Sequence, residues 1–265
     1  EGSSSHRAEA GGNDEISELA AEFNDMADRL QTIEDARRRF VSDASHELKT
    51  PLAGIRLLSD SILQTQDMDA QTVREFVGDI EQESERLARI TENLLRLTRL
   101  DSGLLPEAQR VDLSPVVARV ARMLRLVAEE KKVDLSYEVR REGQTLASED
   151  EIHEIIYNLT ENAIKYNRPG GFVKLALAGD EDNCLLTVSD DGIGIPEEDM
   201  PRIFDRFYRV VKMRSRAAGG TGLGLSIAAD TARRRGGSIG VRARVGGGKG
   251  ITLRLPRCKE GGEER

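Results

Sequence analysis

The chain of 265 residues contains no tryptophan, and aromatic residues make up only 4% of it. Cysteine is also scarce: the two cysteines, Cys184 and Cys258, are far apart and outside any C-x-x-C spacing. This pattern indicates neither a disulfide framework nor a zinc site, and it favours a reducing compartment. The small aromatic share favours long solvated helices over a β-sandwich.

Clustered positive charge and long apolar runs are missing as well. The formal net charge is −8. A general nucleic-acid-binding protein needs clustered Lys and Arg to displace phosphate counterions, so we expect no nucleic-acid partner. No run approaches the roughly 18 apolar residues that span a bilayer, and the start lacks the apolar stretch of a signal peptide. We therefore expect the chain as given to be soluble and cytosolic.

The first part of the sequence predicts helices. Residues 1–13 are rich in Gly, Ser and Ala without periodicity, which is typical of a disordered leader. Apolar residues then recur at spacings of three and four over 14–62, as in the seam of a coiled coil, and again over 73–97. The segment 66–70 interrupts this pattern, with Asp69 as a candidate N-cap. A lone hairpin cannot cover both apolar stripes, so we expect a homodimer that forms a four-helix bundle.

The second part of the sequence is mixed. It predicts helices at about 113–131, 149–167 and 222–235, and strands at 133–140, 144–148, 172–179, 184–190, 238–243 and 250–256. The last two strands are expected to form a hairpin. Strands that alternate with amphipathic helices predict a two-layer α/β sandwich. An irregular stretch of roughly 30 residues interrupts this pattern, and so long a loop in a compact domain indicates a function.

Four segments lie in a fixed order: FVSDASHELKTPLAGI, NLTENAIKYN, DDGIGIP with IFDRFYR just after it, and GGTGLGLSIA. Together they closely resemble the H, N, first-glycine, F and second-glycine boxes of sensor histidine kinases. The segment DEISELAAEFNDMADRL resembles the second helix of a HAMP signal-transfer module, whose first helix is missing. The resemblance covers nearly all of residues 14–257.

The resemblance implies a protein histidine kinase of a two-component system that uses ATP and Mg²⁺. Its expected partners are a second copy of the chain and a response-regulator receiver domain, toward which it would also act as a phosphatase. The expected fold is a dimeric antiparallel four-helix bundle followed by a Bergerat-type ATP-binding sandwich. The full-length protein would be anchored in the membrane through a segment absent here. The expected divisions are a leader at 1–13, a HAMP-like helix at 14–35, a phosphotransfer hairpin at 36–102, a linker at 103–109, an ATP-binding domain at 110–257 and a polar tail at 258–265.

His46 is the candidate phosphoacceptor. It lies two residues from each of the seam positions Ala44 and Leu48, about 200° around the helix, so we predict that it points away from the bundle core. A neutral imidazole offers a nucleophilic nitrogen, and Glu47 is the candidate base that accepts or orients the other proton. Thr50 shares the helix face with His46. By resemblance, its hydroxyl positions water for dephosphorylation of the partner.

Asn158 and Asn162 are four residues apart and share one helix face. An amide oxygen can reach a phosphate-bound Mg²⁺ without adding negative charge. By resemblance, Asn162 is the metal ligand and Asn158 lies in the same nucleotide site. Lys165 would contact phosphate and Tyr166 would pack near the adenine or ribose; the alternatives are a solvated lysine and a core tyrosine.

Asp190 ends an apolar strand, where it is placed to accept a hydrogen bond from the exocyclic amino group of adenine. A buried unpaired carboxylate would otherwise be costly. Gly192 and Gly194 allow backbone conformations and close approaches that a side chain would block. Asp191 stands where many relatives have Asn, so it is either a ligand or part of a structural turn.

The F-box segment is expected to anchor a lid through the packing of Phe204, Phe207 and Tyr208. Arg206 and Arg209 are candidates for contacts either with phosphate or with the helical bundle. Further basic residues of the lid are expected to be solvated charges: Lys212, Arg214 and Arg216.

The second glycine box places Gly220, Thr221, Gly222, Leu223 and Gly224 before an amphipathic helix. Bare amides and a helix N-terminus can then face a triphosphate. No Gly-Lys-Ser/Thr follows, so this is not a Walker loop, and the spacing does not fit a dinucleotide fingerprint. The segment resembles the lid region of Bergerat-fold ATPases.

Two alternatives stand beside a histidine kinase. One is another type of Bergerat-fold protein: an ATPase that drives a conformational cycle, as in gyrase B or heat-shock chaperones, or a kinase that phosphorylates serine. Those relatives lack the helix with His46, Glu47 and Thr50. The other is a scaffold that dimerises without chemistry. The presence of Asn162, Asp190 and the glycines speaks against a scaffold.

Overall fold

The computed structural model describes residues 15–103, 106–210, 220–244 and 247–258. The predicted leader, nearly all of the predicted tail and the basic lid residues at 212, 214 and 216 lie outside the described residues. The chain divides into two compact units between Ile90 and Thr91. In the described ranges, no helix is both long and apolar enough to cross a membrane.

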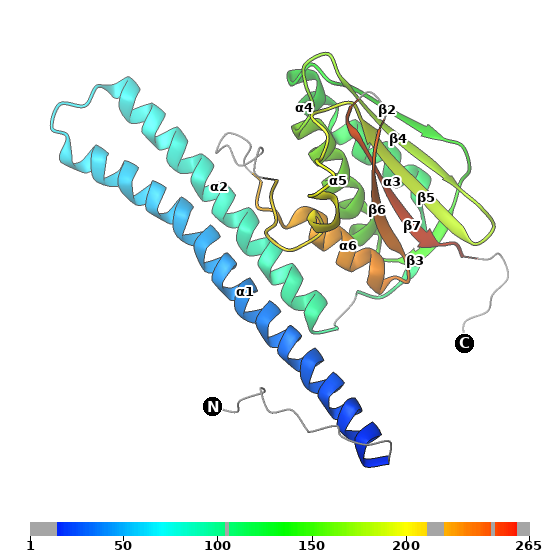
Figure 1. The fold of residues 1–265 in the computed structure, drawn as a ribbon. Helices are drawn as coiled ribbons and strands as arrows, with labels where there is room; N and C mark the ends of the chain where they lie inside the picture. The colour runs from blue at the N-terminus through cyan, green and yellow to red at the C-terminus, as the bar shows by residue number, and fades with distance from the viewer. Residues whose placement is uncertain (1–14, 104–105, 211–219, 245–246, 259–265) are drawn as a thin grey trace. The chain divides into compact units, whose positions relative to one another are not determined.

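The predicted helical hairpin consists of two long helices (Figure 1), and it lies in the first unit except for residues 91–101 at its end, which belong to the second. Helix α1 spans Glu15–Gln64 and runs through Pro51, and helix α2 spans Ala70–Asp101. Asp69 is confirmed as the cap that starts α2, because its Oδ1 accepts hydrogen bonds from the backbone N of Gln71 at 3.0 Å and of Thr72 at 2.9 Å. Hydrogen bonds from Thr72, chiefly from its hydroxyl, hold the pKa of Asp69 below its ordinary value.

Many apolar side chains of the hairpin are exposed in a single chain. On α1 they include Leu19, Phe23, Met26, Leu30, Ile33, Leu52, Leu57 and Leu63. A helix with an apolar stripe gains stability by burying that stripe against another helix. Pairing with a second hairpin therefore remains our prediction for this unit.

The second unit contains the remaining elements and the predicted α/β sandwich. In chain order they are β1 (Gln109–Asp112), α3 (Leu113–Met123), α4 (Arg125–Glu130), β2 (Asp134–Val139), β3 (Gln144–Ala147), α5 (Glu149–Lys165), β4 (Phe172–Gly179), β5 (Asn183–Asp190), η1 (Met200–Arg202), α6 (Gly224–Arg234), β6 (Ser238–Ala243) and β7 (Lys249–Pro256). The five-stranded sheet has the order β2-β4-β5-β7-β6, and β1 pairs with β3 in a separate two-stranded sheet. The predicted final hairpin is confirmed, since β6 and β7 pair antiparallel.

The prediction of one helix over 113–131 is wrong, because α3 and α4 are separate. The backbone of Leu124 between them has ψ near 0°, which tightens the turn. Its side chain is 1% exposed, so burial in the core holds it at this position. The hydrogen bonds from Leu124 N to Val120 O and from Ala128 N to Leu124 O still follow the helical pattern.

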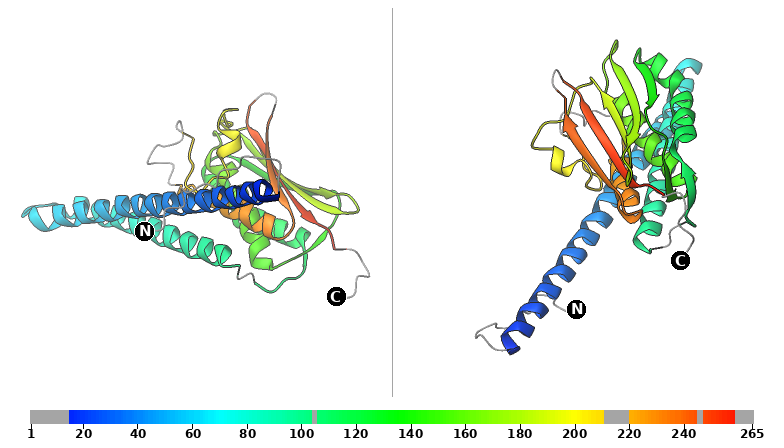
Figure 2. Two further views of the ribbon diagram at one scale, coloured as in Figure 1. Left: turned by 60° about the horizontal axis from the view of Figure 1, so that its bottom comes forward. Right: turned by 90° about the vertical axis from the view of Figure 1, so that its right-hand side faces the viewer.

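Three helices, α3, α5 and α6, pack against the five-stranded sheet and form one layer (Figure 2). The inward side chains of the sheet alternate with outward ones. On β5 the inward row is Cys184, Leu186, Val188 and Asp190, and on β7 it is Lys249, Ile251, Leu253 and Leu255. Two apolar rows therefore each end in a buried charge, and these two charged residues lie opposite each other in the sheet.

Candidate active site

The candidate phosphoacceptor His46 is exposed on α1, as predicted. One turn later, the Thr50 hydroxyl is also exposed and donates a hydrogen bond to the His46 carbonyl at 3.2 Å. The carboxylate of Glu47 is half-buried and lies 3.4 Å from Nη2 of Arg86 on α2. Arg86 was not found from the sequence, because no local pattern links residues 39 positions apart. The arrangement leaves the imidazole accessible and gives the candidate base a cationic neighbour.

The predicted asparagine pair lies on α5. A capping box starts this helix, with reciprocal hydrogen bonds between Ser148 and Glu151. Nδ2 of Asn162 donates to the carbonyl of Asn158 at 2.9 Å, which leaves Oδ1 of Asn162 available as an acceptor or metal ligand. A Cβ atom on Gly224 would lie 3.1 Å from Oδ1 of Asn158. The N box and the second glycine box are therefore in contact.

The end of α5 is joined to the first glycine box through Tyr166. Its carbonyl accepts a hydrogen bond from Ile193 N at 3.2 Å, and a Cβ atom on Gly192 would lie only 2.4 Å from the same oxygen. Burial raises the pKa of the Tyr166 phenol, while the charge of Arg209 opposes this shift. Nζ of Lys165 lies 5.6 Å from the centroid of the Tyr166 ring. Tyr166 therefore joins the N box to the first glycine box.

Asp190 is almost fully buried at the end of β5. Its Oδ1 accepts a hydrogen bond from Gly192 N at 3.1 Å, and its Oδ2 lies 3.0 Å from Nζ of Lys249. A Cβ atom on Gly248 would lie 2.1 Å from the Asp190 carbonyl, which also accepts a hydrogen bond from Arg244 at 3.1 Å. Lys249 was missed in the sequence. Its place in the inward alternation of the last strand was the signal that could have found it.

The contacts of Asp191 support the structural-turn alternative. Its Oδ1 accepts a hydrogen bond from Phe172 N at 2.7 Å, and its Oδ2 lies 3.5 Å from Arg168. Partial desolvation acts to raise the pKa of Asp191, but the Phe172 amide and Arg168 outweigh it, so the pKa is below its ordinary value. This carboxylate fixes the loop to the start of β4.

The F-box segment and the second glycine box are also joined. Phe207 N donates a hydrogen bond to the Gly222 carbonyl at 3.1 Å. Gly222 has φ +71°, and a Cβ atom there would lie 2.8 Å from the Phe207 backbone. Phe207 itself has φ +61°, which is rare for an aromatic residue. Leu223 is buried and its N donates to the Thr221 hydroxyl at 3.3 Å; among the described residues, no side chain caps the first turn of α6. The first amides of α6 are therefore left to bind another acceptor.

Four other residues of the predicted site belong to the glycine boxes and the F box. Gly194 has φ +69°, and a Cβ atom there would lie 3.6 Å from the Gly248 backbone. The Tyr208 hydroxyl donates a hydrogen bond to Asp199. Gly220 and Phe204 are half-buried.

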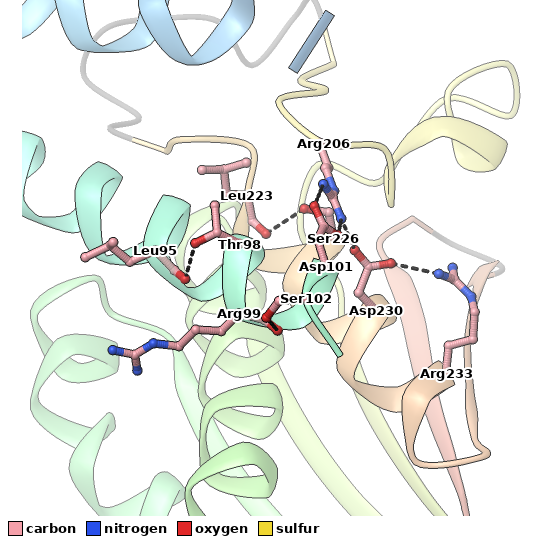
Figure 3. Close-up of polar contacts among 10 residues, drawn as sticks. All are labelled: Leu95, Thr98, Arg99, Asp101, Ser102, Arg206, Leu223, Ser226, Asp230 and Arg233. Carbon is pink, nitrogen blue, oxygen red and sulfur yellow. Dashed lines mark hydrogen bonds and ion pairs between the residues drawn. The ribbon is translucent and has the colours of Figure 1, made fainter. Parts of the chain in front are cut away.

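For Arg206, the structure supports contact with the helix rather than with phosphate (Figure 3). Its Nη1 and Nη2 bind both oxygens of Asp101, the last residue of α2, at 2.8 Å and 2.7 Å. Nη2 also lies 3.1 Å from Asp230 on α6, which pairs with Arg233 at 2.7 Å. The hydrogen bonds with Arg206 hold the pKa of Asp101 below its ordinary value. Arg206 therefore links the end of α2 to α6, which belongs to the same compact unit.

Three family models match the chain. They describe a HAMP domain at residues 1–32, a His Kinase A (phospho-acceptor) domain at 36–103, and a histidine kinase-, DNA gyrase B-, and HSP90-like ATPase at 147–259.

Curated relatives and solved structures resemble the chain over most of its length. It is 35% identical over 92% of its length to the sensor-like histidine kinase SenX3 of Mycolicibacterium smegmatis, of which it covers 63%. It is 34% identical over 94% of its length to the sensor histidine kinase YkoH of Bacillus subtilis, of which it covers 54%. The structure of full-length ShkA in complex with AMPPNP is similar with a TM-score of 0.62 and 25% identity, over 84% of this chain and 46% of that one. The chain thus spans between half and two thirds of the length of these curated relatives.

Proposed function

Because the chain belongs to the sensor histidine kinases, we propose that it transfers the γ-phosphoryl group of ATP to His46 and from there to an aspartate of a response regulator. The observation that carries the proposal is an exposed imidazole beside Glu47, in the same chain as a second unit that gathers Asn162, Asp190 and the glycine boxes. The nucleophile and the nucleotide site therefore belong to different compact units.

The residues of the second unit suit a Mg²⁺-bound nucleotide. Nδ2 of Asn162 donates one hydrogen bond to the Asn158 carbonyl, and Oδ1 of Asn162 would hold the metal ion. The uncapped first turn of α6, which starts at Gly224, would accept phosphate oxygens through its amides. Mg²⁺, when bound, would neutralise phosphate charge. Asp190 would accept the amino hydrogen of adenine.

At the first unit, a nitrogen of His46 would attack the γ-phosphorus in line with the leaving ADP. A bond from nitrogen to phosphorus forms as the bond from the β–γ bridging oxygen to the γ-phosphorus breaks. Glu47 would hold the proton on the other ring nitrogen, and Arg86 fixes the position of this carboxylate. Catalysis then rests on positioning and charge neutralisation, with the two units bringing the reactants together.

We also propose a phosphatase activity toward the partner, carried by Thr50. Its hydroxyl hydrogen is donated to the His46 carbonyl, so its oxygen presents lone pairs to the solvent on the face of His46. These lone pairs can accept a hydrogen bond from an attacking water. In the full-length protein, the HAMP match supports a dimeric, membrane-anchored sensor of which this chain is the cytoplasmic region.

Incubation of the chain with ATP labelled in the γ-phosphate tests the kinase proposal. Protein-bound label that is lost in acid and kept in alkali indicates phosphohistidine, whereas phosphoserine has the opposite stability. Release of inorganic phosphate without labelled protein would identify an ATPase. Absence of both products would identify a scaffold, and the proposal would then be wrong.

A further inference from the structure

Two charges are buried at the end of the sheet that carries the first glycine box. Asp190 and Lys249 are directly opposite in the antiparallel register of β5 and β7, and both face the helices. Their side chains are 1% and 4% exposed, and the oxygen and nitrogen lie 3.0 Å apart. Every other residue of the inward row of β7 is aliphatic. A lysine at the head of this row is therefore unusual, because lysine is rarely buried to this degree.

The pair keeps unused hydrogen-bonding capacity. In the described part of the chain, neither Nζ of Lys249 nor Oδ2 of Asp190 makes a hydrogen bond of good geometry, despite their short separation. A buried ion pair is weak evidence for stability, since well-packed apolar residues can be as stable in its place. A donor and an acceptor that are buried, adjacent and unsatisfied instead suit a ligand that offers an acceptor and a donor side by side.

We propose that Lys249 determines base specificity in the nucleotide site, by donating a hydrogen bond to ring nitrogen N1 of adenine while Asp190 accepts from the 6-amino group. This inference rests on the proposed function and deepens it. The Watson–Crick edge of adenine presents a donor and an acceptor on neighbouring positions, which complement the carboxylate and the ammonium. The same edge of guanine or hypoxanthine carries an acceptor at O6 and a donor at N1, so both contacts become repulsive.

The backbone packs closely around the pair, and glycines occupy the positions of closest approach. Gly192 donates to Asp190, Gly248 lies against its carbonyl, and both positions would clash with backbone if they carried a side chain. The ammonium also balances the carboxylate, so an uncharged base edge can bind without a net buried charge. A carboxylate alone would read the amino group only, whereas the pair reads two neighbouring atoms.

The test compares dissociation constants of ADP and 1-deaza-ADP, in which a C–H group replaces N1, by calorimetry in the presence of Mg²⁺. The whole chain is used as wild type, Lys249→Met and Lys249→Gln. Lys174→Met is the matched control, because Lys174 lies on β4, the strand next to β5, with a side chain that is 43% exposed. We expect wild type and the control to bind 1-deaza-ADP about tenfold more weakly than ADP, as for loss of one hydrogen bond to a charged donor.

In Lys249→Met the ratio of the two constants should fall close to one, and Lys249→Gln should give an intermediate ratio because its amide can still donate. If Lys249 only neutralises Asp190, ADP binding weakens in Lys249→Met but the ratio stays as in wild type, and the proposal is overturned. A wild-type ratio near one overturns it as well.

Purine riboside diphosphate, which lacks the 6-amino group but keeps N1, isolates the contact with Asp190. It should bind more weakly than ADP in wild type and in both Lys249 variants. Should the variants fail to fold, the lysine ammonium NMR signals of wild type decide the matter: one signal should shift with ADP and not with 1-deaza-ADP, and its absence overturns the proposal. Failure of ADP itself to bind would instead refute the proposed function.

Discussion

The Thr50→Ala substitution separates the two proposed activities of one helix. The Thr50 hydroxyl is exposed, and its described hydrogen bond goes to the His46 carbonyl at 3.2 Å. Removal of the hydroxyl should change the free energy of unfolding by less than about 0.5 kcal/mol, as is usual at surface positions. Alanine also favours a helix over threonine by several tenths of a kcal/mol. A functional change in this variant would therefore not come from unfolding.

The expected functional change is confined to dephosphorylation of the response regulator. Loss of one hydrogen bond that orients water costs about 1–3 kcal/mol in the transition state, which corresponds to a roughly ten- to hundredfold slower reaction. Autophosphorylation should stay within a few-fold of wild type, because His46, Glu47 and the second unit are unchanged. The amount of phosphorylated partner should therefore rise.

Thr32→Ala is the matched control for this experiment. Thr32 is also exposed on α1, and its hydroxyl makes the same type of bond, to the Asp28 carbonyl at 2.8 Å. The assay is a pair of time courses with purified partner, one of phosphohistidine formation and one of phosphoaspartate decay with ADP and Mg²⁺. Decay at the wild-type rate in Thr50→Ala, or equal slowing in Thr32→Ala, would refute the assignment.

Three further predictions concern the second unit. Asn162→Asp should slow autophosphorylation at least about tenfold, because a carboxylate cannot donate to the Asn158 carbonyl and changes the charge at the metal position; a wild-type rate would remove Asn162 from the site. Asp190→Asn should weaken ADP binding by roughly 1–3 kcal/mol, and an equal dissociation constant by calorimetry would contradict the adenine contact. Hydrogen bonds from Arg140 and then Lys174 lower the pKa of Glu138 to about 2 from 4.5, so its contribution to stability is present above pH 4.5 and is lost as the pH falls toward 2. Arg140→Gln should raise this pKa in an NMR titration, and an unchanged value would assign the shift to Lys174.

The elements that local patterns control could be predicted from the sequence. The hairpin follows from apolar spacing, and Asp69 caps α2 because its carboxylate can reach amides two and three residues later. The paired asparagines share a face for the same reason, four residues being about one helical turn. Side-chain alternation likewise predicts which residues of a strand face the core. These features depend on short sequence distances.

Contacts between distant segments could not be predicted in this way. Alternation places Lys249 on the inward face of its strand, but only the register of β5 and β7 sets it opposite Asp190. Arg206 was left with two alternatives, and its partner Asp101 lies 105 residues earlier in the chain. The division of the helix at Leu124 was also missed, because tertiary burial rather than propensity fixes that turn.

The most direct test of the account is to locate the phosphoryl group after incubation with Mg²⁺ and ATP. The chain has three histidines, His6, His46 and His153. Peptide mapping by tandem mass spectrometry at neutral to alkaline pH should find phosphate on His46 alone, and His46→Gln should carry none while it binds ADP with wild-type affinity. Phosphate on His153, or acid-labile phosphate retained by His46→Gln, would contradict the central claim.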